Sequence, residues 1–242
     1  MKPFKTKFQR IETKFVLTEA QYQALLPVLN QYMKPNDYAH STIANLYYDT
    51  PTYQMIRWSI DKPDYKEKIR VRSYQAIPQA DSQVFAEVKK KFQKVVYKRR
   101  IDTDLQAAQA FFLGDDQALQ DSQVKNELLY MQRQYGNLQP MMYIYYDRYS
   151  LEGLDDESVR ITFDSNLIYR DYDLDMCLGV YGQDLLPRGY RLMEVKIAGA
   201  YPLWLSHILS ELAIHKSSFS KYGAAYKLVR KQGGIHHVQH AI

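Results

Sequence analysis

The residues with the clearest chemical potential lie in segment 66–72, KEKIRVR. Successive side chains of a β-strand point to opposite faces, so Lys66, Lys68, Arg70 and Arg72 would share one face. Two cations about 6 Å apart repel by roughly 3 kcal/mol at an effective dielectric near 20. Such a row therefore needs interleaved carboxylates or an anionic ligand. Arginine donates paired hydrogen bonds to phosphate oxygens and lysine adds a point charge, so the segment predicts a site for a linear, multiply charged phosphate ligand.

The elements that would position this row are mostly strands. Strands are predicted at 10–15, 41–49, 66–72, 84–92, 95–102, 139–150, 159–164 and 190–197. Helices are predicted at 18–29, 53–60, 104–113, 122–135, 202–212 and 220–230, the first with a capping box from Thr18 to Gln21. The segment Pro35-Asn36-Asp37 is predicted to close the first helical unit.

Most predicted strands have one charged face and one apolar face. An antiparallel sheet packed on one side and wet on the other would show this pattern, and so would a closed barrel with its charged faces inward. In a barrel, Glu12, Glu87 and Glu194 could neutralise part of the cationic charge.

Composition limits the class of protein. The chain has 242 residues, 46% hydrophobic and 24% charged, with a net charge of +5 that favours anionic partners. We expect one domain, 1–242, with 231–242 as a flexible tail. The single cysteine, Cys177, excludes an intramolecular disulfide, and no apolar run reaches the roughly 20 residues that span a bilayer. A cytoplasmic location follows as an expectation, with peripheral placement at the inner face of the membrane through a partner as a further option.

Taken together, these residues resemble the catalytic domain of the vacuolar transporter chaperone (VTC) complex and its bacterial relatives, in the triphosphate tunnel metalloenzyme superfamily. The resemblance covers nearly the whole chain. It is carried by RIETK at 10–14, YYDT at 47–50, YKEKIRVR at 65–72, FAEVK at 85–89, YKRR at 97–100, YDR at 146–148, VRI at 159–161, MEVK at 193–196 and FSKY at 219–222.

The resemblance implies a mainly β (α+β) fold with flanking helices, in which an eight-stranded antiparallel β-barrel forms a triphosphate tunnel. It implies Mn²⁺ or Mg²⁺ as cofactor, held by Glu194. The implied catalytic residues are Lys14, Arg70, Arg72, Lys89, Lys98, Arg148 and Arg160. The implied additional phosphate-binding residues are Arg10, Lys68, Arg100, Lys196, Ser220 and Lys221.

The activity that the resemblance implies is ATP-dependent polyphosphate synthesis, with ATP and inorganic polyphosphate as partners. Related triphosphatases and cyclases carry Glu-x-Glu-x-Lys on the first strand, whereas this chain has Arg10 at the first of these positions, which favours polymer synthesis. Some members have a lysine where Ser218 stands, and whether Lys216 takes that role is open.

Two alternatives remain. One is a tripolyphosphatase or nucleoside triphosphatase of the same fold, and the other is a non-catalytic polyphosphate-binding module that serves a membrane-protein partner. Specific nucleic-acid binding is not expected, because the tyrosines do not interleave with the cations as they do in a stacking platform.

Overall fold

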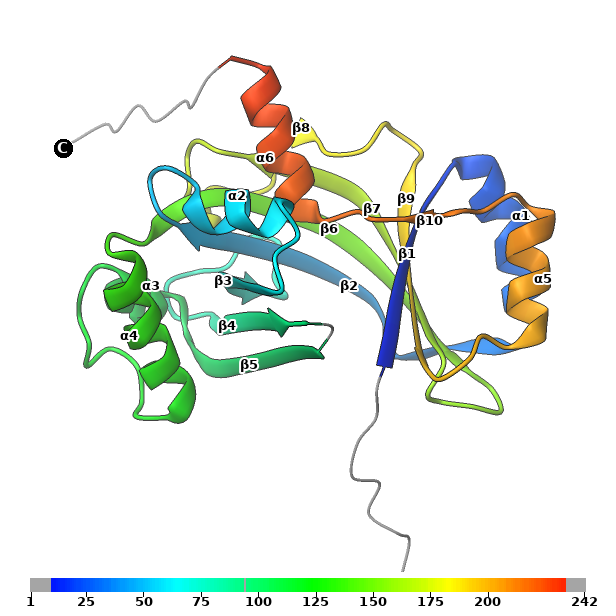
Figure 1. Ribbon diagram of the computed structural model, residues 1–242, viewed down its shortest axis with the longest axis horizontal. Coiled ribbons are helices and arrows are strands. Elements are labelled where there is room, and N and C mark those ends of the chain that lie inside the picture. The colour runs from blue at the N-terminus through cyan, green and yellow to red at the C-terminus, as the bar shows by residue number, and fades with distance from the viewer. Residues whose placement is uncertain (1–9, 94, 234–242) are drawn as a thin grey trace, which may run out of the picture. The chain divides into compact units, whose positions relative to one another are not determined.

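The computed structural model describes residues 10–93 and 95–233 (Figure 1). Its strands are β1 (Arg10–Leu17), β2 (Met33–Asp49), β3 (Tyr65–Ser73), β4 (Gln83–Phe92), β5 (Val95–Asp104), β6 (Gln139–Gly153), β7 (Arg160–Arg170), β8 (Gln183–Asp184), β9 (Arg191–Ala198) and β10 (Lys216–Ser217). Its α-helices are α1 (Glu19–Leu29), α2 (Gln54–Ile60), α3 (Leu105–Phe112), α4 (Gln123–Tyr135), α5 (Leu203–Glu211) and α6 (Lys221–Lys231), with a 3₁₀ turn at Met176–Leu178. Every predicted strand and helix has a counterpart, and only β8, β10 and the 3₁₀ turn were not predicted.

Local sequence signals set the helix ends. The hydroxyl of Thr18 accepts a hydrogen bond from the amide of Gln21, whose side chain accepts one from the Thr18 amide, which confirms the predicted capping box. Ser220 caps α6 in a similar way, since its hydroxyl accepts from the amide of Gly223. Gly136, with φ of 74°, ends α4 at the predicted position.

The prediction that Pro35-Asn36-Asp37 closes the first helical unit is wrong, because α1 ends at Leu29 and these residues lie within β2. Proline is tolerated at strand positions whose amide is not needed for pairing. The Asn36 side chain still forms a local hydrogen bond of the kind found in turns, accepting from the Tyr38 amide at 3.0 Å.

The chain divides into two compact units. The first comprises Met1–Ser41, Asp147–Leu167 and Leu186–Phe219, and the second comprises Thr42–Tyr146, Ile168–Leu185 and Ser220–Ile242. The strands β2, β6 and β7 pass from one unit into the other, so neither unit is a continuous piece of sequence. The expectation of a single domain stays a prediction, as does the flexible tail at 231–242, of which residues 234–242 lie outside the described residues.

In the first unit, β1 pairs with β10 and β9, and β9 also pairs with β7, all antiparallel. One face of these strands packs against α1 and α5. The core includes Phe15, Leu25, Phe163, Val195 and Leu205, all buried. The side chains opposite this face are the charged ones of β1, β7 and β9.

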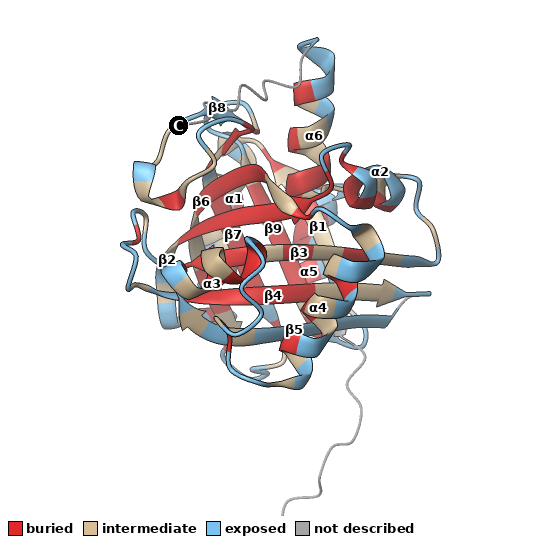
Figure 2. Ribbon diagram, turned by 90° about the vertical axis from the view of Figure 1, so that its left-hand side faces the viewer, coloured by how far each residue is buried: buried red, intermediate tan, exposed pale blue. Residues whose placement is uncertain are grey.

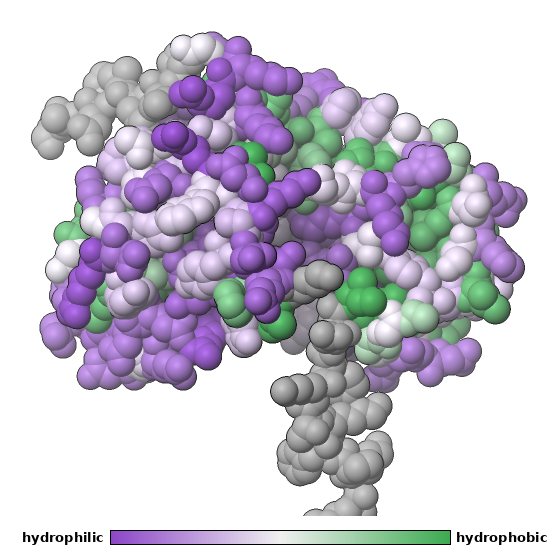
Figure 3. Space-filling model, in the orientation of Figure 1, coloured by the Kyte–Doolittle hydropathy of each residue, from purple (hydrophilic) through white to green (hydrophobic). Residues whose placement is uncertain are grey.

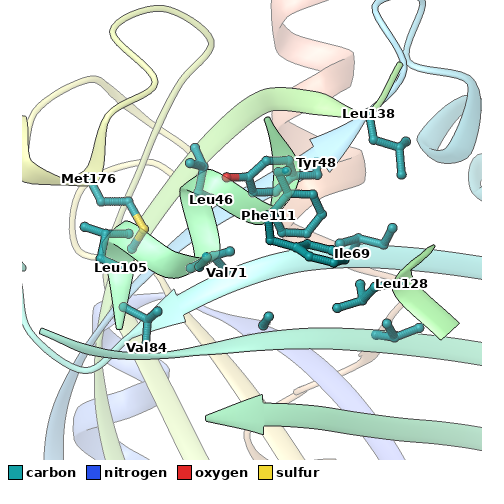
Figure 4. Packing of buried hydrophobic residues seen from close by; sticks show 14 of the residues in the cluster. Leu46, Tyr48, Ile69, Val71, Val84, Leu105, Phe111, Leu128, Leu138 and Met176 are labelled. Carbon is teal, nitrogen blue, oxygen red and sulfur yellow. The ribbon is translucent and has the colours of Figure 1, made fainter. Parts of the chain in front are cut away.

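In the second unit the strand order is β6-β2-β3-β4-β5. Its apolar face packs against α3 and α4, and Figure 4 shows Leu46, Ile69, Val71 and Val84 of the sheet pointing toward residues such as Phe111. Figure 2 shows β4 largely buried and β5 largely exposed, in agreement with their exposures along the sequence. The surface over α4 and β5 is mostly hydrophilic (Figure 3).

The predicted closed barrel is wrong. The structure has a mainly antiparallel sheet with flanking helices, and its pairing order runs from β10 to β5 without a pairing that joins these two strands among the described residues. The eight predicted strands all form, but alternation of charged and apolar residues does not distinguish a one-sided sheet from a closed one. None of the described helices combines the length and the apolar character needed to cross a bilayer.

Candidate functional site: two cationic sheet faces

The polar face of the second unit is built on β3, β4 and β5. Arg70 lies directly opposite Glu87 in the β3–β4 pair, and Lys68 lies opposite Lys89. The next pair, β4–β5, places Lys98 opposite Lys89 and Arg100 opposite Glu87. Residues directly opposite on antiparallel strands share a face, so the rows predicted from sequence form one surface.

Glu87 lies at the centre of this surface. Its Oε2 atom is 2.6 Å from both the Nε and the NH2 atoms of Arg70 and 3.7 Å from Nε of Arg72, and its Oε1 atom is 2.9 Å from Nζ of Lys98. The Glu87 side chain is only 2% exposed. The predicted neutralising role of Glu87 is confirmed.

The ionisation of Glu87 follows from these contacts. Burial raises its pKa, but the charges of Arg70, Arg72 and Lys98 outweigh burial and lower the pKa to about 2. The pKa of Lys98 is lowered, chiefly by burial and against the attraction of Glu87. Glu87 is therefore an ionised, internal counter-ion for the central cations at neutral pH.

One carboxylate does not balance the whole face. Among the described residues of β3, β4 and β5, eight lysines and arginines share it, together with Glu87, Asp102 and Asp104. The eight cations are Lys66, Lys68, Arg70, Arg72, Lys89, Lys91, Lys98 and Arg100. Asp104 is further occupied in capping α3. The surplus of positive charge suits a polyanion.

The N-terminus of α6 joins this face. The ammonium group of Lys68 donates to the hydroxyl of Ser220 at 2.9 Å, and Nζ of Lys221 lies 4.3 Å from the centre of the Tyr146 ring. Lys221 is only 7% exposed. The structure therefore brings Ser220 and Lys68, predicted from distant parts of the sequence, into direct contact.

Sequence reasoning missed the aromatic support beneath these groups. Tyr47 accepts a hydrogen bond from Arg70 at 3.1 Å and stacks on Tyr222 of α6, with ring centres 4.7 Å apart. Tyr222 donates to the buried carboxylate of Asp49 at 3.0 Å. The motifs YYDT and FSKY contain all three residues, but no pattern in either motif indicates that they meet.

Asp49 connects this support to α2. Its carboxylate accepts from the amides of Thr50, Met55 and Ile56, the last two at the start of α2. Burial raises its pKa in spite of these hydrogen bonds and the one from Tyr222. The arrangement fixes α2 and α6 to the end of β2.

Asn45 was also missed. It accepts from Nε of Arg72 at 3.2 Å, and its amide group donates to the Ile144 carbonyl at 3.1 Å. Arg72 is thus oriented from β2, its neighbouring strand. Arg72 is directly opposite Asn45 in the β2–β3 pair, so knowledge of this pairing would have predicted the contact.

The polar face of the first unit has its own charge cluster around Glu194 of β9. The Glu194 carboxylate lies 3.3 Å from Nζ of Lys14, 3.6 Å from Nζ of Lys196 and 3.6 Å from NH2 of Arg148. Lys14 is also 3.5 Å from Glu12. The neutralising roles predicted for Glu12 and Glu194 are confirmed.

Asp164 is the functional neighbour that was missed here. Fully buried, it accepts two hydrogen bonds from Arg148, at 2.6 and 2.9 Å. Its alternation with Arg160 on β7 was visible in the sequence and placed it on this face. The exposed Arg160 lies opposite Lys196 in the β7–β9 pair. For Arg10 the backbone pairs with Ala198.

Lys216 lies away from the polar face. In the β1–β10 pair it is opposite the core residue Phe15, whereas Ser217 is opposite Lys14. Nζ of Lys216 lies 5.7 Å from the centre of the Tyr201 ring. The position of Lys216 therefore gives it no part in the Glu194 cluster.

The donor set does not form a complete metal site. No group of three or more His, Cys, Asp or Glu side chains suited to a metal occurs within 10–93 and 95–233. Glu194 is surrounded by cations, so most ligands of a Mn²⁺ or Mg²⁺ ion would have to be phosphate oxygens and water. Metal binding by Glu194 stays a prediction.

The comparison that decides the family is with family models: the VTC domain model matches residues 9–230. The chain belongs to the VTC domain family. All the sequence motifs that suggested this family lie within the matched residues. The chain has no match among curated proteins.

One solved structure shows the same fold as this VTC domain. A protein described as a "putative adenylate cyclase" from Bacillus halodurans has a TM-score of 0.55 and 13% identity, covering 87% of this chain and 93% of its own. A second protein with that description, from Vibrio parahaemolyticus, has a TM-score of 0.48 and 14% identity, with coverages of 94% and 99%. The first likeness, at this identity, establishes fold and nothing about activity.

Proposed function

We propose that this VTC domain is a polyphosphate polymerase that transfers the γ-phosphate of ATP to a growing inorganic polyphosphate chain. The observation that carries the proposal is the surplus of cations on the polar face of β3, β4 and β5, with Arg70 and Arg72 at its centre. Membership of a family associated with phosphoryl transfer supports it.

The chemistry needs no protein nucleophile. A terminal oxygen of the polyphosphate attacks the γ-phosphorus of ATP, a new P–O–P linkage forms, and the bond from the γ-phosphorus to the bridging oxygen breaks so that ADP leaves with that oxygen. Arg70 and Arg72 would hold phosphate oxygens by paired hydrogen bonds, and Lys98 would add charge neutralisation. Lys14, Arg148 and Arg160 of the first unit are proposed to act in the same way.

The internal carboxylates fit this role. Glu87 holds the guanidinium of Arg70 in place before the ligand arrives, so little side-chain ordering remains to be done on binding. Ser220 and Lys221 would add contacts from α6. A divalent metal, typical of families with this fold, would supply further charge neutralisation at the phosphates, with Glu194 as its protein ligand.

The test is incubation of the protein with ATP and Mn²⁺ or Mg²⁺, followed by gel electrophoresis and nucleotide analysis. The expected products are ADP and a ladder of long anionic chains. The variant Arg70→Gln/Arg72→Gln should make neither, while Lys90→Gln, on the opposite face of β4, should behave as wild type. ADP or orthophosphate without a ladder would instead support the triphosphatase alternative, and intact ATP with tight polyphosphate binding would support the binding module.

A further inference from the structure

The polar face of the second unit ends in aromatic residues beyond its last arginine. Tyr74 follows the final residue of β3, and its hydroxyl accepts a hydrogen bond from NH1 of Arg72 at 3.4 Å. Phe85 of β4 lies opposite Arg72. The rings of Tyr74 and Phe85 meet edge to face, with centres 5.6 Å apart and an interplanar angle of 76°. Tyr74 therefore extends the polar face past the end of β3.

The start of β3 has no such aromatic group on this face. Alternation along the paired strands places Tyr65 of β3, Phe92 of β4 and Tyr97 of β5 on the opposite face of the sheet. Among the described residues of β3, β4 and β5, Phe85 is the only aromatic one on the polar face. The two ends of the polar face therefore suit different parts of a ligand.

The rings of Tyr74 and Phe85 differ in their access to solvent. The guanidinium carbon of Arg100 lies 4.3 Å from the centre of the Phe85 ring, and Phe85 is only 8% exposed. Tyr74 is 44% exposed, although its hydroxyl and ring edge are both in contact and its carbonyl accepts from the Thr42 hydroxyl at 3.3 Å. An aromatic ring that is held in place and open to solvent can stack on a flat ligand.

We propose that Tyr74 is the stacking platform for the base of a nucleoside triphosphate whose phosphates extend toward Arg70. This inference rests on the proposed function, because the base is the part of the phosphate donor that inorganic polyphosphate lacks. At about 3.3 Å per residue, Tyr74 lies about 13 Å from Arg70 along the chain, which leaves room for a sugar and phosphates between them. One exposed ring suits a single nucleotide, whereas a nucleic-acid strand needs aromatic residues interleaved with the cations.

The experiment compares two probes, ATP and inorganic tripolyphosphate, by isothermal titration of the full chain in the presence of a chelator. Tyr74→Leu should bind ATP about tenfold more weakly, the effect of losing one base–aromatic stack, and tripolyphosphate as wild type does. Tyr97→Leu is the matched control, because it removes a similarly exposed tyrosine from the opposite face of the sheet. It should leave both affinities unchanged.

A second variant separates the ring of Tyr74 from its hydroxyl. Tyr74→Phe keeps the ring and removes the acceptor of the hydrogen bond from Arg72, so it should bind ATP and tripolyphosphate as wild type does. If Tyr74 served only to orient Arg72, Tyr74→Leu would weaken both probes in the same proportion. Equal losses for both probes in Tyr74→Leu, or no loss for either, would overturn the proposal.

Failure of the proposed function would look different. If the wild type makes no polyphosphate from ATP but Tyr74→Leu loses ATP affinity selectively, the polymerase proposal fails and the base platform stands. If the wild type makes polyphosphate and Tyr74→Leu binds ATP normally, the polymerase stands and the base platform is refuted.

Discussion

The guanidinium of Arg70 and the carboxylate of Glu87 lie face to face across β3 and β4, with Nε 2.6 Å from Oε2. Because Glu87 is only 2% exposed, this ion pair is a structural part of the sheet as well as a preformed element of the candidate site. Loss of binding and loss of stability must therefore be measured separately.

Removing Arg70 should affect both properties. Arg70→Ala deprives a buried carboxylate of its closest partner while Arg72 and Lys98 remain, so we expect the free energy of unfolding to fall by about 2 kcal/mol. Adding Glu87→Gln should restore part of that loss but no tripolyphosphate affinity. Urea unfolding and isothermal titration of both variants provide the check, and recovery of binding in the double variant would contradict a role for Arg70 in holding phosphate.

The low pKa of Glu87 predicts an acid-sensitive contribution to stability. Its folded-state pKa of about 2 lies below the ordinary value of 4.5, so the contribution is present above pH 4.5 and is lost as the pH falls toward 2. It amounts to about 3 kcal/mol. Urea midpoints from pH 2 to 7 should converge between wild type and Glu87→Gln at the acid end, and a constant difference between the two curves would show that Glu87 does not titrate in this range.

The hydrogen bond from Tyr222 to Asp49 should hold α6 in position against the end of β2. Tyr222→Phe keeps the stack on Tyr47 but leaves the buried Asp49 without one donor, which should lower the free energy of unfolding by about 1 to 2 kcal/mol. Phosphate affinity should fall with it, because Ser220 and Lys221 are presented by the same helix. Tyr130→Phe, on an exposed tyrosine of α4, is the control and should change neither the urea midpoint nor the affinity.

The variant Glu194→Gln should affect phosphate binding and metal binding in opposite directions. Glu194→Gln removes one negative charge beside Lys14, Arg148 and Lys196 while Glu12 and Asp164 remain, so tripolyphosphate should bind more tightly in the presence of a chelator. If Glu194 also holds a metal, the same variant should need more Mn²⁺ for half-maximal polymer synthesis. An unchanged Mn²⁺ requirement, measured across a metal titration, would leave Glu194 with the counter-ion role alone.

Much of the second unit's polar face could be predicted from the sequence. Alternation placed Lys66, Lys68, Arg70 and Arg72 on one face, and the pairing of β3 with β4 confirms it. The position of Glu87 opposite Arg70 could not be read in this way, because the connection from β3 to β4 is long and does not determine the register.

The remaining parts of the candidate site depend on contacts between residues far apart in the sequence. Hydrophobic periodicity and secondary-structure propensity do not predict such contacts. Tyr222 and Asp49 are 173 positions apart, and each residue alone looks like an ordinary strand or helix residue. Closure of the sheet was predicted wrongly for a related reason, since one charged face per strand is compatible with several ways of arranging the strands. The resemblance to the VTC family supplied the candidate site residues that the sequence pattern alone did not indicate.

The hydrogen bond from Lys68 to Ser220 joins residues 152 positions apart, and it has a consequence for synthesis of the chain. At about 5 to 20 residues per second, β3 leaves the ribosome roughly 8 to 30 s before α6 does. During that interval Lys68 lacks its hydrogen-bond acceptor Ser220. The nascent protein should therefore acquire its selective affinity for phosphate chains only after residues 220–231 have emerged. The site is complete only once α6 has been synthesised.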